Sequence, residues 1–499
     1  RSMVSPATGL EHKGWTAAGI ACDEVSQFHP GMLNHVSDRL REVAETQELK
    51  DMPFGGHMVL LQGDFFQLEP VKAKSFFRGT MECLVHGCPA GNVDEAQKWL
   101  DKYGPHKSER EGIELFVKFR RVTLDSQLRT TTDALHLQMI MRFRDVWTDD
   151  PFVLFAEYVN SLKRLTPQDV RSDPEWGCAI VGVVGNDERY ALTETRARAW
   201  AAAAGQLVLR WELPPSGGSV LHSLPEESRA AVYSEEPSLH GFFVRGAPGV
   251  LVRNAGVERG VANGTRCTLV RIGYYAEAAD VDLDLVGDEA PLGKRERAQR
   301  AIEGAAAGSV VDVPAPDYVV VKLEGDPSLF LDCTLLDGLS VVALPESASE
   351  AKDVSVCGLT AASLGLKEVR VRRPLAELSL VCTDYKVQGA SCDYIILSLL
   401  DSGTAPYLTP HGLYVLLTRA TRGRDSIRWL GPQGARAEQA LAGLLTLKRD
   451  MDLVAFVRGY DGDGIWRQPK AKAEYAKLVA QGVAAEAARR EAAAAERGG

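Results

Sequence analysis

The chain has 499 residues, of which 45% are hydrophobic and 25% are charged, and its formal net charge at pH 7 is −10. One core rarely grows beyond about 250–300 residues, so we expect a globular α/β or mixed protein of two or three domains, with no apolar run approaching a membrane span. The nine scattered cysteines argue against a disulfide framework and favour a reducing compartment, and the negative charge argues against a general polyanion binder while leaving room for a narrow basic channel.

Strands and helices are predicted to alternate over the first 165 residues. The run GIACDEVSQ places a strand directly before Asp23, and VLLQGDFFQLEPV places another, at 59–61, before Asp64. Between them, HPGMLNHVSDRLREVA has apolar residues at helical spacing, and Pro30 suits the first turn of a helix. The next predicted elements are a strand at 113–119 (IELFVKF) and helices around 139–141 and 152–162.

A second α/β unit is predicted to begin with the strand GCAIVGVV (177–184) and the Ala-rich helix that follows it. Between about 240 and 373 the pattern changes to short β-rich runs, which are interrupted by a charged, exposed insertion at 287–308. The α/β pattern resumes at LSLVCTDYKVQGASCDYIILSLL (378–400), and an exposed Ala/Glu/Arg-rich helix is expected after about 470.

Polar residues follow the first two predicted strands at the point where each strand ends. Asp23 and Glu24 follow one strand, and Asp64 and Gln67 follow the other. The carboxyl ends of parallel strands meet at one edge of a sheet, so we expect these residues to face one site. An acidic pair there suits Mg²⁺-nucleotide hydrolysis, in which one carboxylate holds the metal through water and the other orients the attacking water. On its own, the pair would also fit a strand end followed by a helix cap.

Four further motifs occur in order along the chain. MIMRFRD places Arg142 on or beside a helix, where it could instead pair with Asp145 or Asp149, and Arg144 is its nearest competitor. GVANGTRCT predicts a hairpin turn at Asn263-Gly264. TDYKVQG (383–389) lies between two apolar runs, and YVLLTRAT (414–421) is predicted to end a buried strand with Thr418-Arg419.

The order DE, GDxxQL, MR, NGTR, TxxKxQG and YVxL[ST]R resembles the petite-integration-frequency (PIF) helicases of superfamily one, and most closely the branch found beside rolling-circle, Helitron-like transposons. The resemblance covers about residues 15–450. It implies an α/β fold with two RecA-like motor domains of the P-loop NTPase type and a small β-barrel inserted in the second. The expected segments are the first motor domain at 1–165, the second motor domain at 166–239 and 374–455, the inserted β-rich domain at 240–373, and a C-terminal tail at 456–499.

The resemblance also implies roles for individual residues. Asp23 would be the Mg²⁺ residue, Glu24 the water-orienting residue and Gln67 the phosphate-sensing amide, while Arg142 and Arg419 would reach the transferring phosphate across a closing cleft. Asp64 and Gly389 are expected beside the nucleotide. The expected DNA-facing residues are Thr383, Lys386 and Gln388, together with Phe65, Phe66 and Tyr385 as candidates for base stacking. Core packing is the alternative for Phe65 and Phe66, and a solvated turn is the alternative for Lys386.

The implied activity is that of an ATP-dependent DNA helicase that moves 5′ to 3′ on single strands, with ATP and Mg²⁺ as cofactors. Its expected partners are single-stranded DNA and duplex junctions, without a membrane, and a monomer is compatible with the sequence. Nuclear or organellar DNA repair, recombination and genome maintenance, including telomeres, would be its setting inside the cell. The alternative is a non-hydrolysing nucleic-acid-binding remnant of such a helicase.

Three departures from the family pattern bear on these expectations. Glu69 stands where the family usually has proline, and Tyr385 replaces a common histidine. No G-x-x-x-x-G-K-[ST] phosphate loop occurs, only 22 residues precede Asp23, and residue 1 is Arg, so we expect a fragment, a processed product or a truncated gene model. The first motor domain would then be truncated at its N-terminus, and the chain as given would bind ATP weakly and turn it over little.

Overall fold

The computed structural model describes residues 19–70, 73–86, 107–124, 133–144, 157–254, 262–275, 293–324, 335–336, 339–345, 351–399, 408–431, 443–444 and 450–482. The chain divides into two compact units. We call Leu162–Tyr407 with Asp425–Ala440 the parallel-sheet unit, and Ser2–Ser161 with Leu408–Arg424 and Leu441–Gly499 the strand-pair unit. Over the described residues, none of the helices has the length and apolar character needed to cross a membrane.

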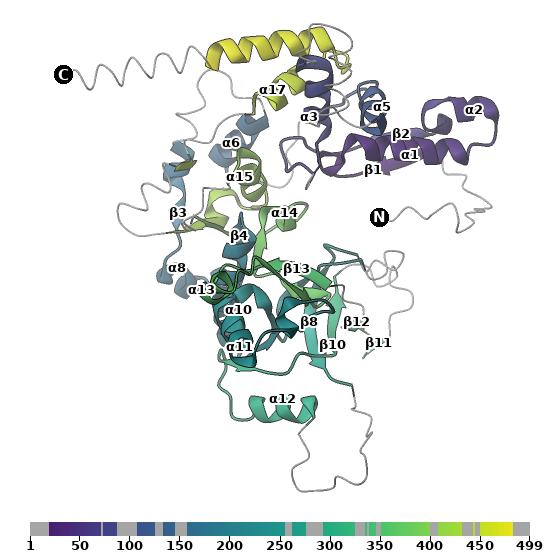
Figure 1. Ribbon diagram of the computed structural model, residues 1–499. Coiled ribbons are helices and arrows are strands. Elements are labelled where there is room, and N and C mark those ends of the chain that lie inside the picture. Colours follow the sequence, from purple (N-terminus) through teal and green to yellow (C-terminus); the bar gives the residue numbers. More distant parts are fainter. Residues whose placement is uncertain are drawn as a thin grey trace. The chain divides into compact units, whose positions relative to one another are not determined.

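The strand-pair unit is named after two parallel strands, β1 (Gly19–Cys22) and β2 (Met58–Leu61), which pair with Cys22 opposite Leu61. Helix α1 (Pro30–Glu42) connects them, as Figure 1 shows. Pro30 occupies the first turn, and the buried apolar side chains of α1 recur at helical spacing. The predicted strand–helix–strand order at the start of the chain is therefore confirmed.

The segment IELFVKF is predicted to be a strand, but it belongs largely to helix α5 (Lys107–Phe116). Ile113 and Phe116 are buried three residues apart, which fits one face of a helix, and Gly112 lies against the carbonyl oxygen of Pro30. A Cβ atom at Gly112 would lie 1.9 Å from that oxygen, so α5 packs directly on the start of α1. A short apolar run does not distinguish a strand from a buried helix, which explains the wrong prediction.

The first half of the segment YVLLTRAT is also helical, in contrast to the predicted strand. Helix α15 spans Pro410–Leu417, and the Thr409 side chain caps it by accepting a 3.0 Å hydrogen bond from the backbone N–H of Gly412. The side chains from Leu413 to Leu417 are all buried, so no polar face reveals the helical period. Other helices of this unit include α2 (Gln47–Asp51), α3 (Phe76–Thr80), α6 (Ala134–Arg144) and α17 (Met451–Arg458), with short helices η2 (Val25–Gln27), η3 (Pro53–Gly56) and η4 (Met81–His86). Residues 157–161 and 468–482 are helical as well.

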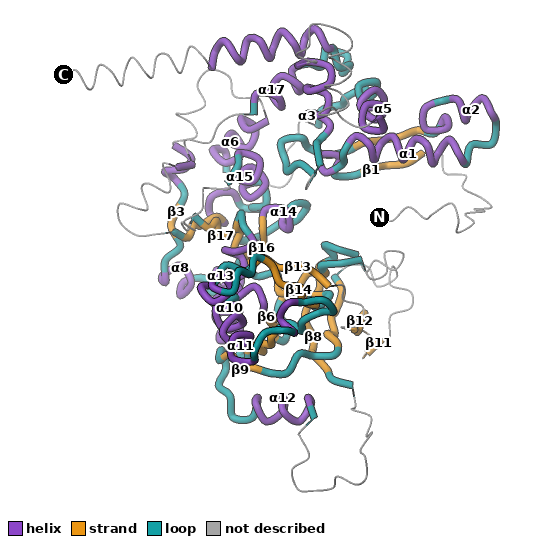
Figure 2. Tube along the Cα trace, in the orientation of Figure 1, coloured by secondary structure: helices purple, strands orange, loops and turns teal. Residues whose placement is uncertain are grey.

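The parallel-sheet unit contains a five-stranded sheet in the order β16-β4-β17-β18-β3, in which every pair of neighbours is parallel. Its strands are β3 (Lys163–Arg164), β4 (Ile180–Val183), β16 (Val381–Thr383), β17 (Ile395–Ser398) and β18 (Ile427–Leu430). Helix α10 (Asn186–Ala204) follows β4, where the Ala-rich pattern predicts a helix (Figures 1 and 2). The buried apolar strands and their parallel pairing confirm the α/β fold class.

The predicted β-rich region, together with β15 just beyond its predicted end, forms a six-stranded sheet in the order β11-β12-β10-β8-β7-β15, with antiparallel neighbours. Its strands are β7 (Pro248–Leu251), β8 (Arg266–Gly273), β10 (Tyr318–Leu323), β11 (Leu335–Leu336), β12 (Leu339–Pro345) and β15 (Ala376–Leu378). Smaller sheets join β5 (Val208–Glu212), β6 (His240–Val244) and β9 (Val310–Asp312), and β13 (Ala351–Ser355) with β14 (Glu368–Arg372). A closed barrel stays a prediction.

Short helices complete the parallel-sheet unit. They are α8 (Pro167–Ser172), α9 (Glu175–Cys178), η5 (Val220–His222), α11 (Glu226–Glu235), η6 (Pro237–Leu239), α12 (Lys294–Ile302), α13 (Leu359–Ser363) and α14 (Asp384–Val387), while η10 (Gly423–Ser426) spans the boundary with the strand-pair unit. Helix α12 lies in the insertion that the sequence predicts to be exposed, and only its Ala298 is buried. The compact units do not identify motor domains, so the predicted domain boundaries stay a prediction.

Candidate functional site

The loops that follow β1 and β2 lie side by side. The backbone N–H of Val25 donates to the carbonyl oxygen of Gln62 at 2.9 Å, and the N–H of Gln62 donates to the carbonyl oxygen of Cys22 at 2.8 Å. Gly63 permits this approach, because a Cβ atom there would lie 2.6 Å from the Val25 nitrogen. The structure therefore brings Asp23-Glu24 and the GDFFQL loop to the same end of the strand pair, as the motif positions predict.

Glu24 has a left-handed backbone conformation, with φ 54° and ψ 47°. Its backbone N–H donates a 2.8 Å hydrogen bond to Oδ1 of the preceding Asp23, whose side chain is exposed. A left-handed conformation costs about 1–2 kcal/mol for a residue with a Cβ atom, and such strain often occurs at functional sites. The backbone thus turns sharply at the acidic pair.

Gln67 carries a buried acceptor. Its Oε1 has no hydrogen-bond partner within the described part of the chain, although its backbone N–H donates to the Asp64 carbonyl oxygen at 3.0 Å. A buried amide oxygen normally finds a donor, so this atom is available to a water molecule or a ligand group in the adjoining loops. This arrangement fits the role predicted for Gln67.

Asp64 and the two phenylalanines after it have partners within the strand-pair unit. Asp64 accepts hydrogen bonds from the backbone N–H of Phe66 at 3.1 Å and from the hydroxyl group of Tyr414 at 2.7 Å. The Phe65 ring packs edge-on against Phe116 and Phe456, with centroids 5.8 and 5.5 Å away. Phe65 thus has the core contacts that the sequence left open as the alternative, and the base-stacking roles and the nucleotide contact of Asp64 stay predictions.

The two predicted arginines differ in exposure. Arg142 lies in the last turn of α6, where its side chain is exposed, while Asp145, Asp149 and the side chain of Arg144 lie outside the described residues. Arg419 is only 2% exposed and donates from Nε to the carbonyl oxygen of Val415, in the last turn of the preceding helix, at 3.0 Å. Its guanidinium group is therefore turned toward its own helix α15, and its reach to a phosphate stays a prediction.

An ion pair that sequence reasoning missed connects the start of α6 to the segment after Arg419. Oδ2 of Asp133 accepts from Arg424 Nε at 2.8 Å and from the Arg424 backbone N–H at 2.9 Å, and its Oδ1 accepts from the N–H of His136 at 3.1 Å. Burial alone would raise the pKa of Asp133, but these bonds lower it to about 2. An Asp just before a helix is a capping signal, although its distant partner is not visible in sequence.

The TDYKVQG segment begins at the end of β16 and forms helix α14. Thr383 is buried, Tyr385 is 41% exposed, and Gly389 has a left-handed φ of 78° that ends the helix. Asp384 is buried, and this burial raises its pKa to about 6. The segment therefore presents Tyr385 and part of Lys386 at the surface of the parallel-sheet unit, while Thr383 and Asp384 point into it.

Glu377 of β15 is the centre of a charged cluster that the sequence did not reveal. Its carboxylate accepts from Arg189 at 2.9 Å, from Arg373 at 3.0 Å and from Lys386 at 3.3 Å. Burial would raise the pKa of Glu377, but the three cations outweigh burial and hold it well below its usual value. The centroid of the Tyr190 ring lies 4.3 Å from Cζ of Arg189 and 4.7 Å from Cζ of Arg373, at the distance of a cation–π contact.

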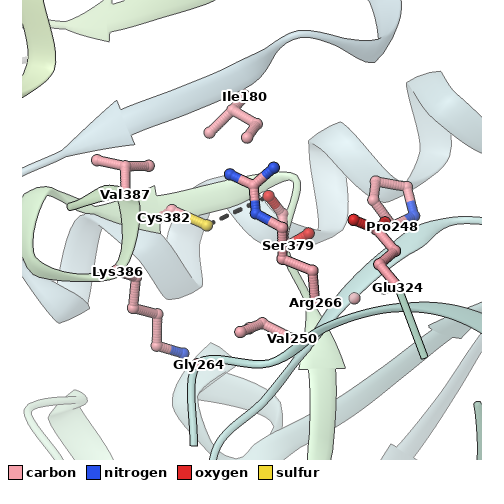
Figure 3. A pocket seen from close by; sticks show the side chains of 11 residues that line it. Ile180, Pro248, Val250, Gly264, Arg266, Glu324, Ser379, Cys382, Lys386 and Val387 are labelled. Atoms are coloured by element: carbon pink, nitrogen blue, oxygen red, sulfur yellow. Dashed lines mark hydrogen bonds between the residues drawn. The ribbon is translucent and has the colours of Figure 1, made fainter. Parts of the chain in front are cut away.

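A pocket lies beside this cluster, within the parallel-sheet unit, and Figure 3 shows its lining. Arg266 from the NGTR motif and Lys386 from TDYKVQG both line it, so two motifs that are distant in sequence meet there. Among the described residues, no three His, Cys, Asp or Glu side chains form a group that could hold a metal ion by themselves. Mg²⁺ commonly takes only one or two protein carboxylates in addition to nucleotide phosphates and water, so an exposed Asp23 fits that ion.

Comparison with known proteins finds one family model that matches part of this chain, and solved structures of low sequence identity. Residues 3–86 match the family model described as PIF1-like helicase. The crystal structure of Pif1 helicase from Bacteroides with ADP-AlF3 and ssDNA is 16% identical, with a TM-score of 0.48 over 91% of this chain and 77% of that chain. That of Pif1 helicase from Candida albicans is 16% identical, with a TM-score of 0.40 over 85% and 76%.

A structure of two coordinating Pif1 helicases at forked dsDNA is 18% identical, with a TM-score of 0.47 over 93% of this chain and 81% of that chain. No curated protein matches the chain. The matched segment 3–86 contains both Asp23-Glu24 and the GDFFQL loop. The part of the chain that forms the strand pair and its two polar loops is thus similar to PIF1-like helicases.

Proposed function

We propose that this chain is an ATP-dependent DNA helicase of the PIF1-like kind. The observation that carries the proposal is the placement of Asp23, Glu24 and Gln67 on adjoining loops of a parallel strand pair. These loops lie inside the segment that is similar to PIF1-like helicases. Carboxylates at the ends of parallel strands, with an amide acceptor beside them, suit the hydrolysis of a nucleotide bound with Mg²⁺.

The chain's own residues divide this chemistry among them. Asp23, exposed after β1, would hold Mg²⁺ through water, and Glu24 would orient the attacking water. The Gln67 Oε1 atom, which has no partner in the described residues, would accept a hydrogen bond from that water. ATP supplies the transferable phosphoryl group when it is bound. Arg142 and Arg419 would offset the negative charge that develops on this group.

The DNA-facing surface is proposed on the parallel-sheet unit, around Thr383, Lys386 and Gln388, with Gly389 ending their helix and Tyr385 exposed for stacking. Related structures are described with ssDNA and with forked dsDNA, which supports single strands and duplex junctions as partners here. We extend the proposal to 5′-to-3′ movement, to the Helitron-like branch, and to repair, recombination and genome maintenance in the nucleus or an organelle.

A non-hydrolysing nucleic-acid-binding protein is the second candidate. The observation that favours it is the burial of Arg419, whose guanidinium bonds to Val415 and Thr418 of its own segment. An arginine that acts on a phosphate must present its donors to that phosphate, and a buried one needs a rearrangement first. A chain that binds DNA without ever rearranging this segment would not hydrolyse ATP.

One experiment separates the two candidates. ATP hydrolysis is measured with and without single-stranded DNA for the wild type, Glu24→Gln and the exposed control Glu48→Gln, and DNA binding is followed by fluorescence anisotropy. Turnover that DNA stimulates, that Glu24→Gln abolishes and that Glu48→Gln leaves unchanged supports the helicase, however slow it is. DNA binding without such turnover supports the second candidate. A protein that shows no DNA binding and no ATP turnover contradicts both candidates.

A further inference from the structure

Arg266 is a cation presented by a rigid turn into the pocket of Figure 3. We propose that Arg266 and Lys386 together hold one backbone phosphate of single-stranded DNA in this pocket. The inference rests on the proposed function and deepens it, because it adds the β-rich region to the DNA-facing surface and assigns Arg266 to a phosphate contact.

The turn that carries Arg266 is held by several hydrogen bonds. The N–H of Gly264 donates to the Leu251 carbonyl oxygen at 2.8 Å, and the N–H of Thr265 donates to the Ala262 carbonyl oxygen at 3.0 Å. Asn254 adds a side-chain acceptor, 2.9 Å from the N–H of Asn263. Gly264 has a φ of 87°, which suits glycine at this turn. The position of Arg266 is thus preorganised at the start of β8, which lowers the entropy cost of a contact made there.

The guanidinium group of Arg266 makes no hydrogen bond or ion pair within the described part of the chain, and its side chain is exposed. One carboxylate, Glu324, is among the residues that line the pocket, and Figure 3 shows it beside Pro248, on the other side of Arg266 from Lys386. The charged lining therefore consists of two cations and one carboxylate, which leaves a net positive charge. An anion would bind on the Lys386 side of Arg266.

Lys386 has a partner, but its charge is not neutralised. It lies 3.3 Å from Glu377, which also pairs with Arg189 and Arg373, so three cations share one carboxylate. The effect of this surplus extends to Lys352, whose pKa is lowered by burial and by the nearby cations Arg373, Lys386 and Arg189. The surplus creates a positive potential beside the pocket, while Glu377 restrains the long Lys386 side chain.

These charges suit a phosphodiester. A guanidinium group offers several donors to phosphate oxygens and an ammonium group adds a compact charge, so one phosphate can be held by both. DNA is the source that the surroundings favour, because Tyr385 is 41% exposed one residue before Lys386 and offers a stacking surface for a base. A phosphate beside an exposed aromatic ring is the pattern expected for a single strand.

The test measures binding of fluorescein-labelled oligothymidine by anisotropy over a range of salt concentrations. Arg266→Ala is compared with Arg271→Ala, which removes the same charge from an exposed arginine of the same strand outside the pocket. We expect Arg266→Ala to weaken binding on the order of tenfold. It should also lower the slope of log K against log salt by about 0.7, the value for one phosphate contact on a single strand. Arg271→Ala should leave both quantities unchanged.

Two further variants test whether the phosphate is shared. Arg266→Lys keeps the charge, so it should restore the salt slope while recovering only part of the affinity. In a double-mutant cycle, Arg266→Ala with Lys386→Ala should weaken binding by less than the product of the two single effects, since either change already frees the same phosphate. Effects that multiply would overturn the shared phosphate.

The outcomes keep the inference separate from the proposed function. The wild type could bind the oligonucleotide while Arg266→Ala and Arg271→Ala show equal affinities and equal salt slopes. That result would overturn the phosphate contact in the pocket and leave the proposed function standing. Wild-type protein that does not bind the oligonucleotide overturns both. Unchanged far-UV circular dichroism and thermal midpoints of the variants establish that any loss of binding is not a loss of folding.

Discussion

The hydroxyl group of Tyr414 donates a 2.7 Å hydrogen bond to Oδ2 of Asp64, a residue 350 positions earlier in the chain. Tyr414 belongs to α15, which ends just before Thr418-Arg419, and Asp64 belongs to the loop that carries Gln67. The motifs GDFFQL and YVLLTR, which the sequence interpretation assigns to different motor domains, are thus joined within the strand-pair unit.

Removing this hydroxyl group should destabilise the strand-pair unit. Tyr414→Phe deletes a hydrogen bond to a charged acceptor, so we expect the free energy of unfolding to fall by about 1–2 kcal/mol in a urea titration. The matched control is Tyr275→Phe, because the ring of Tyr275 is exposed and its hydroxyl group makes no hydrogen bond within the described residues. Equal stabilities of the two variants would contradict the role of the Tyr414–Asp64 bond.

The Asp133–Arg424 pair predicts a pH-dependent contribution to stability. The pKa of Asp133 is lowered from 3.8 to about 2, so its contribution is fully present above pH 3.8 and is lost as the pH falls through 2. Asp133→Asn should lower the free energy of unfolding by about 2 kcal/mol at pH 7. The deficit should stay constant down to about pH 4 and shrink below it. The exposed Asp463→Asn is the control, and a deficit that does not vary below pH 4 would count against this ion pair.

Asp384 predicts the opposite dependence. Burial raises its pKa from 3.8 to about 6, so the stability that it contributes is fully present below pH 3.8 and is lost as the pH rises through 6. Asp384→Asn keeps the acceptor for the N–H of Tyr385 without the buried charge. It should match the wild type near pH 4 and exceed it by roughly 3 kcal/mol at pH 7.5. Chemical denaturation at the two pH values, with exposed Asp353→Asn as the control, checks this, and an equal gain at both would refute it.

The left-handed conformation of Glu24 predicts a preference for glycine. Glu24→Gly and Glu24→Ala both remove the carboxylate, so both should abolish ATP turnover, but glycine also relieves the strain at φ 54°. The glycine variant should be more stable than the alanine variant by about 1 kcal/mol. At Glu48, within helix α2, the same comparison should have the opposite sign, since alanine is the better helix former. Urea unfolding of the four variants decides the matter, and an alanine preference at both positions would exclude the strained turn.

Glu377 should be among the most sensitive positions of the parallel-sheet unit. Glu377→Gln leaves Arg189, Arg373 and Lys386 together without their shared carboxylate. Both arginine side chains are less than 10% exposed. We expect a loss of about 3–5 kcal/mol in the free energy of unfolding, as for other broken buried ion pairs. Glu368→Gln, on the exposed face of β14, is the control and should cost little. A loss below about 1 kcal/mol would show that the cluster does not depend on this carboxylate.

Local pattern was sufficient for the first strand, helix and strand of the chain. Helical spacing after Pro30 and short apolar runs before Asp23 and Asp64 predict α1, β1 and β2, because side-chain period and strand-end polarity are properties of neighbouring residues. The meeting of the two polar loops also follows from the sequence, since parallel neighbours end at the same edge.

The helices α5 and α15 could not be read from the same pattern. Both contain apolar runs that a buried strand would also have, and the distinction depends on what packs around them. Pro30 lies against Gly112 of α5, and Asp64 receives the hydroxyl group of Tyr414 from α15. These partners are distant in sequence, so no local period records them.

The amino-acid sequence alone therefore determined the local scaffold of the proposed chemistry: an acidic pair and an amide at neighbouring strand ends, and a basic residue in each of the motifs NGTR and TDYKVQG. Only the tertiary structure decided which of these residues are buried, paired or available. Arg419 is turned into its helix, Glu377 gathers three cations, and Arg266 meets Lys386 in one pocket. Burial and counter-charges depend on contacts between distant segments, and these exist only once the chain has folded.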